Sequence, residues 1–133
     1  MSRRPPLFAY GTLQFPVILE RLISRTPEMV PAVMTGGIAR RLPGVSFPGL
    51  ILDGDGEVSG VLLTDLSAPE WKILEDYEDD FYDLEPITVV TEHGEVISAL
   101  AFVVDVELTT DELWTIEWFT EFHLVEFTAS LEY

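Results

Sequence analysis

A glycine turn near the start of the chain, Tyr-Gly-Thr-Leu at residues 10–13, most constrains what this sequence can fold into. It follows an apolar run that is typical of a buried strand over residues 7–10. It precedes apolar residues at helical spacing over 15–23, with Pro16 in the first turn, where proline is tolerated. A turn between a strand and a helix leaves backbone N–H groups without intrahelical partners, and such groups can hold an anion.

A second segment, Leu-Glu-Asp-Tyr-Glu at residues 74–78, places Glu78 near the end of a predicted amphipathic helix. That helix begins with a Ser-Ala-Pro-Glu capping box at residues 67–70, and its predicted inner face consists of Ile73, Leu74 and Tyr77. Aromatic residues Tyr77, Phe81 and Tyr82 surround Glu78 in the sequence, and so do the acidic residues Glu75, Asp76, Asp79 and Asp80. Like charges raise the pKa of a carboxyl group, which makes Glu78 a candidate base. The alternative is that residues 75–80 form a solvated helix end and residues 10–13 a plain turn.

The rest of the chain predicts strands joined by hairpins. Glycines end a predicted strand over 30–35 at Gly36-Gly37, and a Pro- and Gly-rich loop over 43–49 leads to a strand over 50–52. We predict hairpin turns at residues 53–56 and 92–95, which join strands over 57–65, 87–91 and 96–104. A final helix, capped by residues 109–112, carries Leu113, Trp114, Trp118, Phe122 and Val125. The pattern predicts an α+β domain over residues 1–133, with a mixed, strongly curved sheet that closes as a small β-barrel with flanking helices.

The charge distribution excludes several classes of partner. Residues 1–52 carry six arginines and two glutamates, whereas residues 53–133 carry one lysine and 22 acidic residues, within a net charge of −17. Nucleic acid and anionic membrane surfaces are therefore not expected as partners. Solubility explains most of the acidic excess. A more specific interpretation is that the arginine-bearing part helps to bind a carboxylate of a ligand, while the acidic part supplies a catalytic base.

The residue inventory excludes further kinds of site. Cysteine is absent, which removes disulfides and thiol nucleophiles, and the two histidines are not paired, so we expect no metal and no cofactor. Residues 53–57 resemble a calcium loop only faintly, since they lack its ligand spacing, and no Gly-x-Ser-x-Gly elbow occurs. No apolar run reaches the ~20 residues of a membrane span, and the amino terminus does not read as a signal peptide, so we expect a cytoplasmic protein.

The ordered motifs resemble the γ-glutamylcyclotransferase-like superfamily, and within it the plant avirulence-induced-gene-type branch. The motifs are residues 10–13 after the first strand, Phe-Pro-Gly-Leu at 47–50, Gly60, and residues 74–78 followed by Tyr82. The resemblance covers roughly residues 6–104. It implies a mixed barrel and an intramolecular aminolysis, in which the α-amine of a γ-glutamyl group attacks its own side-chain carbonyl. The products are 5-oxoproline and an amine or amino acid.

The resemblance also implies roles for individual residues. Glu78 matches the catalytic glutamate that accepts and returns the proton. The binding loop matches Tyr10, Gly11, Thr12, Leu13, Gln14 and Phe15, whose backbone amides would hold the α-carboxylate or the developing oxyanion of a small γ-glutamyl substrate. Tyr82 is predicted as a further substrate contact, and the charge asymmetry of the chain predicts another at Arg41 or its neighbour Arg40.

Two positions depart from the family pattern. Asp79 stands where a glycine often follows the glutamate, and Leu84 stands where an arginine often follows the tyrosine. These departures leave the substrate preference and the activity open, and the sequence names neither the leaving group nor the oligomeric state. A non-catalytic metabolite-binding or interaction module on the same fold is the alternative function.

Overall fold

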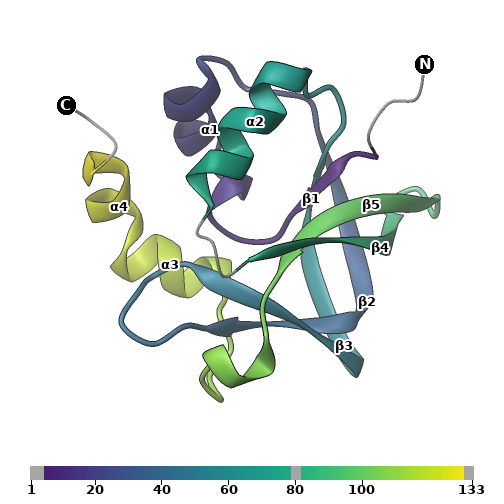
Figure 1. Ribbon diagram of the computed structural model, residues 1–133, viewed down its shortest axis with the longest axis vertical. Helices are drawn as coiled ribbons and strands as arrows, with labels where there is room; N and C mark the ends of the chain where they lie inside the picture. Colours follow the sequence, from purple (N-terminus) through teal and green to yellow (C-terminus); the bar gives the residue numbers. More distant parts are fainter. Residues whose placement is uncertain (1–4, 79–81, 131–133) are drawn as a thin grey trace.

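The computed structural model describes residues 5–78 and 82–130, and its centre is a closed barrel of five strands in the order β1-β3-β2-β4-β5 (Figure 1). The strands are β1 (Leu7–Ala9), β2 (Met29–Arg41), β3 (Pro48–Leu63), β4 (Asp83–Thr91) and β5 (Val96–Val103). The α-helices are α1 (Pro16–Ile23), α2 (Ala68–Tyr77), α3 (Ile116–Phe122) and α4 (Leu124–Ser130). Two short 3₁₀ helices are η1 (Thr12–Gln14) and η2 (Val106–Leu108).

Strand β1 closes the barrel and makes its sheet mixed. Leu7 pairs with Leu63 of the antiparallel strand β3 and with Leu100 of the parallel strand β5. All three residues of β1 are buried, as expected for a short strand with neighbours on both sides and core on both faces. The predicted α+β class with a closed mixed barrel and flanking helices is confirmed.

The hairpin of β2 and β3 differs from the prediction at two places: at Gly36-Gly37, where a strand was expected to end, and at residues 53–56, where a hairpin turn was expected. Strand β2 continues through Gly36 and Gly37, and residues 53–56 form no hairpin turn. Thr35 pairs with Glu57 and Gly37 with Leu52, so four residues of β3 bulge opposite Gly36. A Cβ on Gly56 would lie 2.3 Å from the Gly37 carbonyl oxygen, so glycine permits a close backbone approach here. The hairpin connection lies at residues 42–47 instead.

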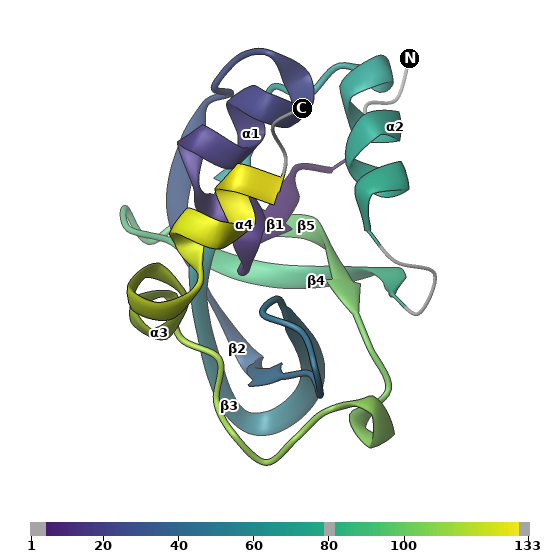
Figure 2. The ribbon, with the colours of Figure 1, turned by 90° about the vertical axis from the view of Figure 1, so that its left-hand side faces the viewer.

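Helices α1 and α2 lie together over one end of the barrel (Figures 1 and 2). Pro16 occupies the first turn of α1, and the Ser67–Glu70 capping box opens α2, both as predicted. Helix α2 buries Trp71 and Leu74 in the main core, whereas Ile73 is 41% exposed, so its assignment to the inner face was wrong.

The carboxyl-terminal segment begins with an extended stretch where a helix was predicted. Its backbone bonds to β2: Thr110 N–H donates to Arg41 (2.8 Å), Arg41 N–H to Glu112 (2.9 Å), and Trp114 N–H to Ala39 (3.0 Å). Helix α3 begins only at Ile116, where the Thr115 hydroxyl accepts from Trp118 N–H.

The buried residues of this segment also differ from the prediction. Trp114 and Phe119 are buried, whereas Leu113, Phe122 and Val125 are exposed.

None of the helices within residues 5–78 and 82–130 has the length and apolar character needed to cross a membrane.

Candidate functional site

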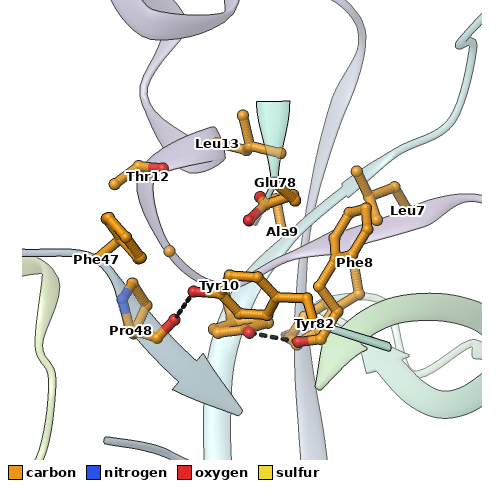
Figure 3. Close-up of a pocket in the computed structure, with 12 residues that line it drawn as sticks. Leu7, Phe8, Ala9, Tyr10, Thr12, Leu13, Phe47, Pro48, Glu78 and Tyr82 are labelled. Atoms are coloured by element: carbon orange, nitrogen blue, oxygen red, sulfur yellow. Dashed lines mark hydrogen bonds between the residues drawn. The ribbon is translucent and has the colours of Figure 1, made fainter. Parts of the chain in front are cut away.

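A small cavity of about 30 Å³, partly open to solvent, lies where β1 passes into η1 (Figure 3). The wall is largely apolar and brings the amino-terminal loop together with the end of α2. The lining residues are Leu7, Phe8, Ala9, Tyr10, Gly11, Thr12, Leu13, Phe47, Pro48, Glu78, Tyr82 and Phe102.

The loop after β1 contributes Gly11, Thr12 and Leu13 to the lining of this cavity. Its own turn is closed by the bonds from Gln14 N–H to the Gly11 carbonyl (3.1 Å) and from Phe15 N–H to the Thr12 carbonyl (3.2 Å). Within the described residues, no hydrogen bond uses the N–H groups of Gly11, Thr12 and Leu13. Consecutive N–H groups without an acceptor suit an anionic group of a ligand.

Gly11 permits the loop to lie against the Phe47-Pro48 wall of the cavity. A Cβ at position 11 would lie 2.7 Å from Cγ and 2.9 Å from Cδ of Pro48. The φ angle of Gly11 is −122°, which any residue can adopt, so the requirement for glycine comes from space. The sequence motifs at residues 10–13 and 47–50 therefore meet at this contact.

Tyr10 fixes the floor of the cavity. Its buried hydroxyl donates to the Phe102 carbonyl in β5 and accepts from Leu50 N–H in β3 (3.1 Å). Burial raises the pKa of Tyr10 well above its usual range, the nearby negative charge of Glu78 raises it further, and the Leu50 N–H opposes both effects. Tyr10 therefore stays a neutral phenol, and Glu78 lies close enough to act on it electrostatically.

Glu78 lies at the carboxyl-terminal end of α2 and lines the cavity above Tyr10 (Figure 3). Its N–H donates to the Leu74 carbonyl (3.3 Å), and its backbone is extended, so it is the first residue beyond the helix. The residue is half-buried. Of the acidic neighbours that were expected to raise its pKa, Asp79 and Asp80 lie outside the described residues, so that effect stays a prediction.

The structure brings together five of the seven loop and helix positions of the predicted site: Tyr10, Gly11, Thr12, Leu13 and Glu78. Tyr82, predicted as a substrate contact, also lines the cavity. Gln14 does not: its side chain donates to the Gly11 carbonyl (3.3 Å), and the residue lines a second, wider cavity beside β3 and Trp114. Phe15 instead packs on Phe119, with ring centroids 5.3 Å apart.

The predicted arginine contacts are not brought to the cavity. Arg41 donates to Glu112 (2.8 Å) and to the Leu113 carbonyl (3.1 Å), and its guanidinium lies 4.0 Å from the centroid of the Trp118 ring. The Nη1 atom of Arg40 lies 3.9 Å from the Oδ1 atom of Asp111. Arg41 therefore holds the carboxyl-terminal segment against β2, whereas the Arg40–Asp111 contact is exposed to solvent.

Sequence reasoning missed several residues of the site. Phe47 and Pro48 were quoted for the resemblance but not as cavity wall, and Phe8 and Phe102 carried no polar signal. Tyr77 was assigned to the helix core, yet its hydroxyl also lies 3.2 Å from the Thr12 hydroxyl. Of the two departures from the family pattern, Asp79 is not described, and Leu84 packs against the main core. Among the described residues, no group of three or more His, Asp or Glu side chains is arranged to hold a metal.

Comparison with known proteins agrees with this geometry. The family described as "Gamma-glutamyl cyclotransferase, AIG2-like" matches residues 7–118, which include every residue that lines the cavity. The chain belongs to this family. Its curated relatives include AIG2-like protein C of Arabidopsis thaliana, 36% identical over 98 residues that make up 73% of this chain and 57% of the relative. AIG2-like protein A of the same plant is 31% identical over 65% of this chain and 52% of its own length.

Solved structures of AIG2-like and cyclotransferase proteins share the fold. A solution structure of an Arabidopsis thaliana protein superposes with a TM-score of 0.76 at 23% identity and covers 98% of this chain and 81% of its own. A structure named gamma-glutamyl cyclotransferase has a TM-score of 0.69 at 14% identity. The superposition covers 96% of this chain and 86% of that structure's chain. The chain spans only a little over half the length of the curated AIG2-like relatives it matches.

Proposed function

We propose that this protein is a γ-glutamyl cyclotransferase that converts a γ-glutamyl amine or γ-glutamyl amino acid to 5-oxoproline and the free amine. The observation that carries the proposal is that Glu78 lines one small cavity together with Gly11, Thr12 and Leu13, whose N–H groups make no hydrogen bond within the described residues. Membership of the AIG2-like family and the shared fold support the same reaction class.

The reaction needs one group that moves a proton twice. The substrate's α-ammonium must lose a proton before its nitrogen can attack, and Glu78 accepts this proton. The nitrogen then forms a bond to the γ-carbonyl carbon, and the carbonyl oxygen becomes an oxyanion. When the bond from that carbon to the departing nitrogen breaks, Glu78 returns the proton to the leaving group, the oxyanion re-forms the carbonyl, and the ring nitrogen releases its second proton to water, so the five-membered ring of 5-oxoproline remains.

The loop amides provide the complementary charge stabilisation. The N–H groups of Gly11, Thr12 and Leu13 are fixed by the turn that Gln14 and Phe15 close, so they need no rearrangement to meet an anion. Their ligand is either the α-carboxylate of the substrate or the oxyanion that develops during attack. Apolar walls from Leu7, Phe8 and Phe102 strengthen these interactions because they exclude water.

The direct test is release of 5-oxoproline from a panel of γ-glutamyl amines and γ-glutamyl amino acids by the purified protein. Turnover of at least one compound, above the rate of spontaneous cyclisation, is the expected result. Binding of these compounds by calorimetry without any 5-oxoproline would contradict the enzymatic proposal and favour a ligand-binding module. Absence of both binding and turnover would contradict both functions.

A further inference from the structure

A second cavity, of about 450 Å³ and partly open to solvent, lies beside the candidate site. Its wall includes residues 56–59 of β3 and residues 113–117, which lead into α3. Tyr10 lines this cavity as well as the smaller one. The proposed reaction makes no use of the wider cavity.

Strand β3 has an open edge at this cavity, because β1 is much shorter than β3 (Figure 1). The pairing of β1 with β3 ends at Ala9 and Val61, and the chain then turns into η1. Among the described strands, residues 57–59 therefore have β2 as a neighbour on one side and no strand on the other. Such an edge can pair with another chain.

The pairing of Pro31 shows which backbone groups this edge presents. Pro31 lies opposite Val61 and has no N–H, so this is a pair without mutual hydrogen bonds, and Val61 directs its N–H and C=O away from β2. Directions alternate along a strand, so Ser59 and Glu57 direct theirs to the same side, which β1 no longer covers. Within residues 5–78 and 82–130, neither residue makes a backbone hydrogen bond outside the strand ladders.

The pairing of β2 with β4 gives the same assignment independently. Thr91 N–H donates to the Glu95 carbonyl (2.9 Å), so the preceding residue, Val90, directs its backbone groups towards β2. Val90 lies opposite Val33, whose groups therefore point to β4 and away from β3. Ser59 lies opposite Val33 on β3, so its own N–H and C=O point away from β2.

The cavity offers apolar surface beside this edge. Val58 and Trp114 are buried, and Ile116 is 37% exposed. Side chains alternate along β3, since Val58 is buried between the exposed residues Glu57 and Ser59. A strand added here would therefore place every second side chain on apolar surface and the others in solvent.

The charge of the cavity favours a basic occupant. Glu57 and Glu117 line it with exposed carboxylates, and none of its described lining residues is basic. Residues 73–133 contain no lysine or arginine, and Arg40 and Arg41 of β2 already contact carboxylates. A second copy of this chain, with its net charge of −17, is a poor complement to such a surface.

We propose that this edge of β3 is a docking site for an extended segment of a partner protein, in which apolar residues alternate with lysine or arginine. The segment adds as a strand to residues 57–59, main-chain hydrogen bonds supply affinity, and the alternating side chains supply specificity. This inference concerns a surface outside the candidate active site, and its tests need no turnover.

Amide hydrogen exchange of the free protein tests the open edge. The amides of Glu57 and Ser59 should exchange at least about 10-fold faster than those of Val58 and Gly60, which face β2. Equal protection of all four amides would show that the edge is already paired and would overturn the proposal.

The binding probe is an acetylated peptide in which lysine and valine alternate, titrated by calorimetry and NMR. Lysines should lie opposite Glu57 and Ser59, so the lysine amides should face β3. N-methylation of the lysine amides should weaken binding by at least about 10-fold, whereas N-methylation of the valine amides should change it by less than about 3-fold. Binding of the unmodified peptide should slow exchange of the Ser59 amide.

Protein variants test the same contacts from the other side. Ser59→Pro removes an N–H that points away from β2 and should weaken binding by at least about 10-fold. Glu57→Lys and Glu117→Lys should each weaken it by about 3- to 10-fold at low salt, and less at high salt. Glu92→Lys, on the hairpin between β4 and β5, is the matched control. If Ser59→Pro does not fold, the methylated peptides decide with the unaltered protein.

Several results would overturn the proposal. Equal affinities of the two methylated peptides would exclude strand addition, and equal binding of a peptide with glutamate in place of lysine would exclude the charge preference. Lack of binding by the lysine–valine peptide would exclude the site. A dimer of the free protein that Ser59→Pro dissociates would make a second copy the occupant.

Discussion

Gly11 and Pro48 touch so closely that a single methyl group on Gly11 would lie 2.7 Å from the Pro48 ring. The contact joins the loop after β1 to the start of β3, two segments that form adjacent walls of the cavity. Proline cannot rotate its ring away as a long side chain can, so any side chain at position 11 must displace backbone. The shape of the cavity therefore depends on the absence of a side chain at this one position.

Replacement of Gly11 by valine should displace the loop. We expect a loss of about 1–3 kcal/mol in the free energy of unfolding from overpacking, and a γ-glutamyl ligand should no longer bind measurably. Gly54→Ala is the matched control, because a Cβ there meets nothing within 4 Å. Urea unfolding and calorimetry measure the two effects. Unchanged ligand binding in Gly11→Val would show that the loop is not part of the binding site.

Removal of the proposed base should stop the reaction without unfolding the protein. Glu78→Gln keeps the shape of the side chain but cannot accept a proton, so turnover should fall by on the order of 10²–10⁴-fold while ligand binding is largely kept. Asp76→Asn is the control, since Asp76 lies on the outer side of α2 paired with Lys72 at 3.4 Å. Equal rates for wild type and Glu78→Gln would refute the role of Glu78.

The loop amides predict a requirement for the α-carboxylate of the substrate. An analogue without this carboxylate should bind much more weakly, although the acidic surface repels it less. Moderate salt should speed encounter of the parent compound, because salt screens exposed charges over a Debye length of about 10 Å at 0.1 M. Calorimetry of both compounds at low and moderate salt tests the prediction. Equal affinities would mean that the amides do not hold the α-carboxylate.

The ion pair between Arg25, which follows α1, and Glu70, in the first turn of α2, predicts that the stability of the fold decreases in acid. The guanidinium contacts the carboxylate at 2.6 and 2.7 Å and lowers the pKa of Glu70 from 4.5 to about 2. Because the pKa is lower in the folded state, the stabilisation is complete above pH 4.5 and is lost as the pH falls towards 2.

The matching variant is Glu70→Gln, which keeps an oxygen that can accept the Ser67 N–H bond of the capping box. Wild type should exceed it by at most about 1 kcal/mol in free energy of unfolding at pH 6, since Arg25 is partly exposed to solvent. The difference should shrink as the pH falls through 2 and vanish below it. Urea titrations across this range measure it, and a difference independent of pH would exclude the ion pair as its source.

The fold was predictable from the sequence where local signals decide the structure. The capping box at Ser67, Pro16 in the first turn of α1 and the hairpin at residues 92–95 all depend on neighbours in the chain. The bulge opposite Gly36 was not predictable, because a glycine pair in a strand signals a turn and a bulge equally well. Only the contact of Gly56 with Gly37 on the partner strand decides between them.

The candidate site divides in the same way. Glu78 and residues 10–13 could be named from motifs, and the structure brings them to one cavity, while their chemical roles stay predictions. The contacts of Tyr77 with Thr12 and of Pro48 with Gly11 join residues far apart in the chain, and no periodicity reports such pairs. The arginines were misplaced because charge predicts attraction to a substrate but not competition from Glu112 and Trp118.

Strand β1 is synthesised before both strands that it pairs with, β3 and β5. Leu7 must wait for Leu63 and then for Leu100 before its hydrogen bonds are complete. Pairing across such long separations is slow, because the entropy of closing the loop is lost before any contact repays it. The loop that follows β1 is therefore synthesised early and shaped late. A nascent chain stalled before β5 would contain most of the residues of the cavity and yet have no cavity.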